Sequence, residues 1–242
     1  NSLMVQFWGA LATRDARLMT HVLASHFPDR LTNATYATYI RCHDDIGWAI
    51  TDEDAAALNL SGPAHRSYLS DFYEGSFPGS FAQGEPFQVN AATGDMRISG
   101  SFASLAGLEK ARGSEQQQAA LQRMLLGHAL IACFGGIPLI YMGDELALLN
   151  DASYRDRADH AHDSRWLHRP VMDWARAEQR NQRESVPGKA FGGLQHILAR
   201  RRATRTGQGA AHHPAAHLGQ PQRPPRRRSG PQRSFGFGLP FG

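Results

Sequence analysis

The sequence predicts an α/β architecture in which amphipathic helices alternate with short buried strands. Residues 35–42 alternate β-branched or aromatic side chains with small ones, as a strand does, and the apolar run 137–142 is typical of a strand covered on both faces. Acidic residues follow each strand, at 43–45 and at 144–145. The chain therefore contains two predicted β/α units, each with polar side chains at the carboxyl end of its strand.

The first predicted helix spans residues 2–26. Leu3, Phe7 and Leu11 recur at helical spacing, and Leu18 and Val22 continue the same stripe. Pro28 and Asp29 end it. This order of helix and then strand suits a β/α unit.

Residues 50–114 predict a long insert, because glycine and proline interrupt the pattern throughout and only residues 52–58 are typical of a helix. Five aromatic side chains of the insert could stack on sugars but are more typical of a small core. They are Phe72, Tyr73, Phe77, Phe81 and Phe87.

A buried helix is predicted for residues 115–134, ended by two glycines, and it leads into the second strand. Residues 151–168 form a charged loop, and residues 189–202 predict a last helix with one apolar stripe. The loop holds three histidines, and the end of the chain holds three more, but neither group has cysteine or carboxylate partners at a recognised metal-binding spacing. These histidines are His160, His162, His168, His212, His213 and His217.

Charge is unevenly distributed along the 242 residues. The chain has 26 basic and 22 acidic residues, and the segment 204–242 holds six arginines and no acid, so residues 1–203 carry 20 − 22 = −2. This proline- and arginine-rich segment has too few large aliphatic residues to form a core, so we expect a disordered basic tail. Its composition is the one that a shifted reading frame in a GC-rich gene would give. A tail of this kind could bind nucleic acid, but it has no interleaved aromatic residues, and nucleic-acid binding is not expected.

Cysteine content and hydropathy suggest the protein's environment. Cys42 and Cys133 are the only two cysteines, which argues against a disulfide framework and suggests reduced, buried thiols in a cytoplasmic protein. No apolar run reaches the roughly 18 residues that a membrane span needs, so no membrane partner is expected.

Several long motifs resemble one enzyme family. They are IRCHDDIGW, TDEDAAALNLSG, GSFAQGEPFQVNAATGDMRISG, GGIPLIYMGDELALLNDASY and DSRWLHRP, within residues 1–203. Together they resemble amylosucrases, which belong to glycoside hydrolase family 13 of the α-amylase superfamily. The resemblance implies a partial TIM (β/α)8 barrel: its last two β/α units in residues 1–49 and 115–203, with the insert 50–114 in the loop after strand seven. A complete barrel takes about 250 residues, so the chain is expected to be a carboxyl-terminal fragment of the catalytic barrel.

The resemblance also assigns roles to five residues. Asp44 is the implied transition-state stabiliser, and His43 binds the glucosyl ring beside it. Asp45 and Arg97 match positions that contact the fructosyl half of sucrose or the acceptor, whereas outside this family they would be ordinary surface charges. Arg165 matches an arginine that closes the pocket by pairing with an acid from earlier in the barrel, so here it is expected to be unpaired.

The implied activity is transfer of glucose from sucrose to an α-1,4-glucan acceptor with release of fructose, without metal or nucleotide cofactor. Asp144 and Glu145 would then anchor a loop. Retaining chemistry needs a nucleophile and an acid/base about 5 Å apart, which the family takes from strands four and five. Since these strands are not in this sequence, the chain alone is expected to be inactive. The alternatives are another sucrose-active hydrolase of the superfamily or a non-catalytic truncated product, and neither oligomeric state nor product length follows from the sequence.

Overall fold

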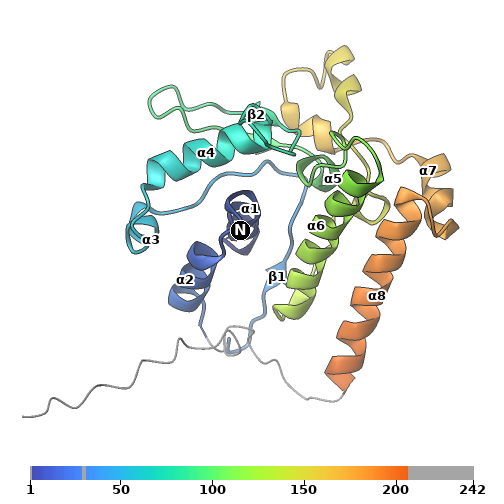
Figure 1. Ribbon diagram of the computed structural model, residues 1–242, viewed down its shortest axis with the longest axis horizontal. Helices are drawn as coiled ribbons and strands as arrows, with labels where there is room; N and C mark the ends of the chain where they lie inside the picture. The colour runs from blue at the N-terminus through green and yellow to red at the C-terminus, as the bar shows by residue number, and fades with distance from the viewer. Residues whose placement is uncertain (1, 29–30, 207–242) are drawn as a thin grey trace, which may run out of the picture.

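The computed structural model describes residues 2–28 and 31–206 as helices grouped around short strands (Figure 1). The predicted disordered tail lies outside these residues, except for its first three. The α-helices of the described part are α1 Ser2–Thr13, α2 Arg17–His26, α3 Asp52–Ala56, α4 Gly62–Glu74, α5 Phe102–Leu105, α6 Ser114–Cys133, α7 Trp174–Glu178 and α8 Val186–Thr206. The strands are β1 Ala37–Thr38, β2 Glu85–Phe87, β3 Arg97–Ser99 and β4 Ile137–Pro138. Short 3₁₀ helices cover Asp144–Leu146, Ala152–Asp156, Ser164–His168 and Gln179–Asn181.

The two predicted β/α strands pair with each other in parallel, Ala37 with Ile137 and Thr38 with Pro138. The ladder is much shorter than the predicted strands, because each has a single partner strand and Pro138 has no N–H to donate. The prediction that the second strand is covered on both faces is wrong for this structure, since Ile137 is 56% exposed and Leu139 48% exposed. The described residues form two two-stranded sheets and no closed one, so the barrel stays a prediction.

Residues 2–26 form two helices rather than the one predicted. Arg14 adopts a left-handed conformation with φ 57°, which breaks the helix. The Asp15 carboxylate then accepts the backbone N–H of Arg17 at 2.9 Å and starts α2. A continuous apolar stripe therefore did not guarantee a continuous helix, because the break is made by local polar contacts.

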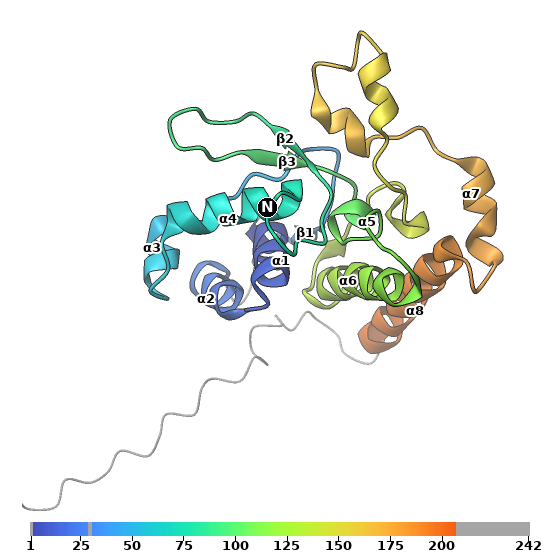
Figure 2. The same ribbon diagram turned by 45° about the horizontal axis from the view of Figure 1, so that its top comes forward.

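The insert contains a 13-residue helix, α4, that the sequence analysis missed. Gly62 and Pro63 look like helix breakers, but proline is tolerated in the first turn, and the Ser61 hydroxyl caps the helix by accepting the N–H of Ala64. Gly75, with φ 102°, ends it. A β2–β3 hairpin extends beside α4 (Figure 2).

The insert shares one aromatic core with helix α1 and the segment that follows β1. Trp8 of α1 meets Tyr73 of α4 and Phe102 of α5 edge to face, with ring centroids 5.1 and 5.3 Å apart. The Trp8 indole donates to the carbonyl of Ile40 at 3.2 Å, and the Tyr73 hydroxyl donates to the carbonyl of Trp8 at 2.6 Å. These contacts fix the position of the insert relative to the chain that follows β1.

Most of the five insert aromatics belong to this packing, as predicted. Phe72 is buried and contacts the rings of Tyr73, Phe77 and Phe81, although Phe77 is 40% exposed. Phe87 instead lies beneath the guanidinium of Arg165, 4.7 Å from its ring centroid. Phe87 therefore packs against the charged loop that contains Arg165 rather than in the core.

The two longest helices, α6 and α8, pack side by side, and α6 also contacts β4 (Figure 1). α6 begins and ends within one residue of the prediction, whereas α8 starts three residues earlier than predicted and continues to Thr206, past the predicted boundary at 203. The thiol of Cys133, predicted to be buried, is exposed at the end of α6, and Cys42 is half-buried. None of the helices in the described ranges has the length and apolar character needed to cross a membrane.

Candidate functional site

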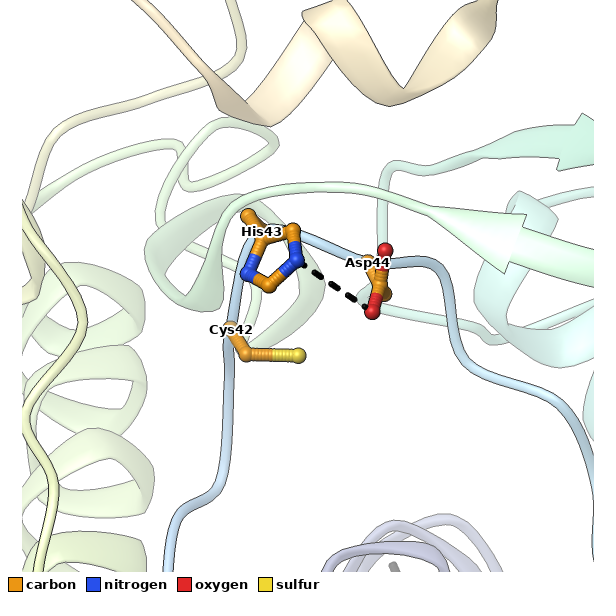
Figure 3. A group of neighbouring side chains, drawn as sticks. All are labelled: Cys42, His43 and Asp44. Carbon is orange, nitrogen blue, oxygen red and sulfur yellow. Dashed lines mark ion pairs between the residues drawn. The ribbon is translucent and has the colours of Figure 1, made fainter.

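The candidate site lies where the chain leaves β1 and bends at His43 and Asp44 (Figure 3). Three side chains hold the backbone of this bend. The guanidinium of Arg169 donates to the carbonyl of His43 at 2.8 Å, and the ring of His168 contacts the same carbonyl at 3.1 Å. Arg41 donates to the carbonyl of Asp44 at 3.0 Å. Hydrogen bonds to backbone carbonyls thus fix the bend, and they leave the side chains of His43 and Asp44 available to contact a ligand.

His168 is fully buried and links the bend to the segment after β3. Its Nδ1 accepts the backbone N–H of Gly100 at 3.2 Å, so Nε2 carries the proton that it donates to the His43 carbonyl. Burial, reinforced by the charge of Arg41, lowers the pKa of His168 to about 2. This histidine is therefore neutral and structural.

Arg41 is also buried, at 1% exposure, and its Nε donates to the carbonyl of Gly100 at 3.0 Å. Its Nη1 makes no hydrogen bond to any of the described residues, and burial lowers the pKa of its guanidinium. Asp144, which follows β4, is buried nearby, and burial raises the pKa of its carboxyl well above the usual range. His128 of α6 lies 3.9 Å from this carboxyl, and burial lowers its pKa to about 4.

Asp44 presents a carboxylate that is about half exposed. His43 Nε2 lies 3.5 Å from one of its oxygens, and Arg165 and Arg169 approach the other at 3.8 and 4.0 Å. Arg165 was expected to be unpaired, and this is wrong: it forms a two-pronged pair with Asp163, at 2.9 and 2.7 Å, which lowers the pKa of Asp163 to about 2. The loop itself supplies the partner, two positions earlier in the sequence.

Asp45 and Arg97 form an ion pair, with 2.7 Å between the Asp45 carboxylate and Arg97 Nε, although they are 52 positions apart. Antiparallel contact of Ile46 with Ile98 brings the two segments together. The Asp45 side chain is 3% exposed and that of Arg97 is 49% exposed, so the carboxylate lies beneath the guanidinium. Arg97 Nη1 donates a hydrogen bond to the side-chain oxygen of Gln88 at 3.1 Å. Arg97 is therefore the member of this pair that faces solvent.

All five residues singled out from the sequence lie along the bend or the segments packed against it. Sequence reasoning missed three arginine and histidine residues that hold the bend, namely Arg41, His168 and Arg169. An arginine inside a strand-like run was the available signal for Arg41. His168 had been set aside with the histidines of the charged loop, of which His160 stacks on Trp166 at 3.5 Å.

The site presents the exposed carboxylate of Asp44 and the imidazole of His43. The arginines near them are Arg97, Arg165 and Arg169, and the ring of Phe87 lies beneath Arg165. Such a surface can accept and donate hydrogen bonds to a polyhydroxylated ligand, and its carboxylate can stabilise a developing positive charge. Comparison of the chain with models of known protein families finds no match.

Proposed function

We propose that this chain supplies part of the sugar-binding site of a sucrose-dependent glucosyltransferase of the amylosucrase type, which moves glucose to an α-glucan acceptor. The ion pair between Asp45 and Arg97 is the observation that carries the proposal. The sequence resemblance assigns these two distant residues to the same sugar subsite, and they lie within 2.7 Å of each other next to Asp44.

In this proposal each side chain has a separate role. Asp44 stabilises the positive charge that develops at the glucosyl centre, and His43 hydrogen-bonds a ring hydroxyl. Arg97 faces the fructosyl or acceptor sugar, and the buried Asp45 orients it. Arg165, fixed by Asp163 and lying over Phe87, closes the side of the site next to Asp44. A rigid cation next to a carboxylate restricts the orientation in which a sugar can bind.

Binding of sucrose to the full chain tests this proposal, because binding does not require the nucleophile or the acid/base. We expect saturation-transfer NMR signals from sucrose that weaken in Arg165→Met. Arg17→Met is a matched control, because Arg17 pairs with Asp15 two positions earlier, as Arg165 does with Asp163, but lies at the start of α2. Equal signals from both variants, or no signal from the unmodified chain, would contradict the proposal.

A further inference from the structure

Three different metal-ligating side chains converge at the bend after β1. One donor atom each from Cys42, His43 and Asp44 lies within 4.8 Å of the other two, and the His43 and Asp44 atoms are 3.5 Å apart. Figure 3 shows the thiol, the imidazole and the carboxylate around a common space. The prediction that the chain binds no metal rested on its histidine clusters and did not consider Cys42 in this arrangement.

The local backbone explains why consecutive residues can share a ligand. In an extended strand neighbouring side chains point to opposite faces, so His43 would point away from Cys42 and Asp44. The bend at His43 and Asp44 removes this alternation. Arg41, His168 and Arg169 hold this bend by its carbonyls, so the backbone that carries the three side chains is fixed before any ligand arrives.

The spacing and chemistry of the donors fit a tetrahedral, thiophilic cation. Bonds of about 2.0–2.3 Å to zinc place neighbouring ligands of a tetrahedron roughly 3.3–3.8 Å apart. The 3.5 Å between His43 and Asp44 already matches such an edge, and the thiol of Cys42 needs to approach by a side-chain rotation. A thiolate selects zinc over magnesium or calcium, which prefer oxygen ligands.

We propose that Cys42, His43 and Asp44 form a Zn²⁺ site with three protein ligands and a fourth position open to solvent. On binding, the Cys42 thiol releases one proton to solvent, and its sulfur forms the bond to zinc. The imidazole and carboxylate bind through their lone pairs. Arg165 and Arg169 oppose a cation here, but both approach the Asp44 oxygen that faces away from His43.

Zinc and sugar would compete for the bend, a consequence that rests on the proposed function. The zinc site uses His43 and Asp44, the same side chains that are proposed to bind the glucosyl ring. Zinc bound there would also occupy the carboxylate that is proposed to stabilise positive charge. Zn²⁺ is therefore expected to displace sucrose from the chain.

Cobalt binding to the full reduced chain tests the metal site by itself. We expect one equivalent of Co²⁺ to give a near-ultraviolet thiolate-to-cobalt band together with visible bands of tetrahedral intensity, and Zn²⁺ to abolish both. Cys42→Ser should remove the thiolate band, and His43→Ala should weaken Co²⁺ binding by about tenfold or more. Cys133→Ser is the matched control, since Cys133 is the other free cysteine and lies at the end of α6.

A second measurement needs no variant. Zn²⁺ should slow alkylation of Cys42 by iodoacetamide, read by mass spectrometry, and leave alkylation of Cys133 unchanged. Lack of a thiolate band at saturating Co²⁺, equal protection of both thiols, or loss of the band in Cys133→Ser would each overturn the metal site. If zinc binds but sucrose does not, the proposed function fails alone; if sucrose binds but zinc does not, the metal site fails alone.

Discussion

The unequal burial of Asp45 and Arg97 predicts that the two halves of this ion pair are not equivalent for stability. The Asp45 side chain is 3% exposed and the Arg97 side chain 49% exposed. Arg97→Met leaves a buried carboxylate without its cation, which is costly. Asp45→Asn removes that charge and leaves only a guanidinium that already faces water.

The expected magnitudes follow from this geometry. Two opposite charges about 4 Å apart near a protein surface attract by about 4 kcal/mol, and solvent around the half-exposed Arg97 screens about half of this. We expect Arg97→Met to lower the free energy of unfolding by about 2 kcal/mol and Asp45→Asn to lower it by less than about 1 kcal/mol. The double variant should be more stable than Arg97→Met alone, because it has no buried carboxylate at position 45.

Urea unfolding followed by tryptophan fluorescence measures these differences. Trp48 is a suitable reporter, since it is buried and bonded to Ser70, whose hydroxyl donates to the carbonyl of Met96 next to Arg97. Equal losses for the two single variants, a larger loss for Asp45→Asn, or strictly additive losses in the double variant would refute the reasoning.

Three further outcomes are expected. The 242-residue chain should release no fructose from sucrose above background, since the resemblance assigns the nucleophile and acid/base to strands outside it; steady turnover would contradict this. Gly127→Ala should lower the free energy of unfolding in urea by about 1–3 kcal/mol, because the alanine Cβ would lie 2.7 Å from the Phe102 ring. An unchanged urea midpoint would show that the Phe102 ring can move aside. Lowering the pH from 6.5 to 5 should destabilise the chain. The pKa values of His128 and His168 are about 4 and about 2, so both residues stay neutral in the folded chain but take up protons in the unfolded chain. Each of them should lower the free energy of unfolding by about 2 kcal/mol over this range. The raised pKa of Asp144 stabilises the folded chain as the pH falls, but it is one group against two histidines. A urea midpoint that rises at pH 5 would therefore contradict the prediction.

Elements whose signals are local could be predicted from the residues that form them. α6 was predicted to within one residue because its apolar periodicity and its flanking glycines lie in one continuous segment. The polar bend after the first strand also followed from adjacent residues. α4 could have been found in the same way, since the Ser61 cap and Pro63 in the first turn are local signals of a helix start.

Which side chains meet and which are buried follows from how distant segments pack together. The ion pair of Asp45 with Arg97, the burial of Arg41 and the neutral state of His168 each depend on segments far apart in the sequence. The convergence of Cys42 with His43 and Asp44 depends on a bend that distant side chains hold in place. Burial and charge pairing depend on what the rest of the chain brings near a residue, and spacing along one segment does not determine this.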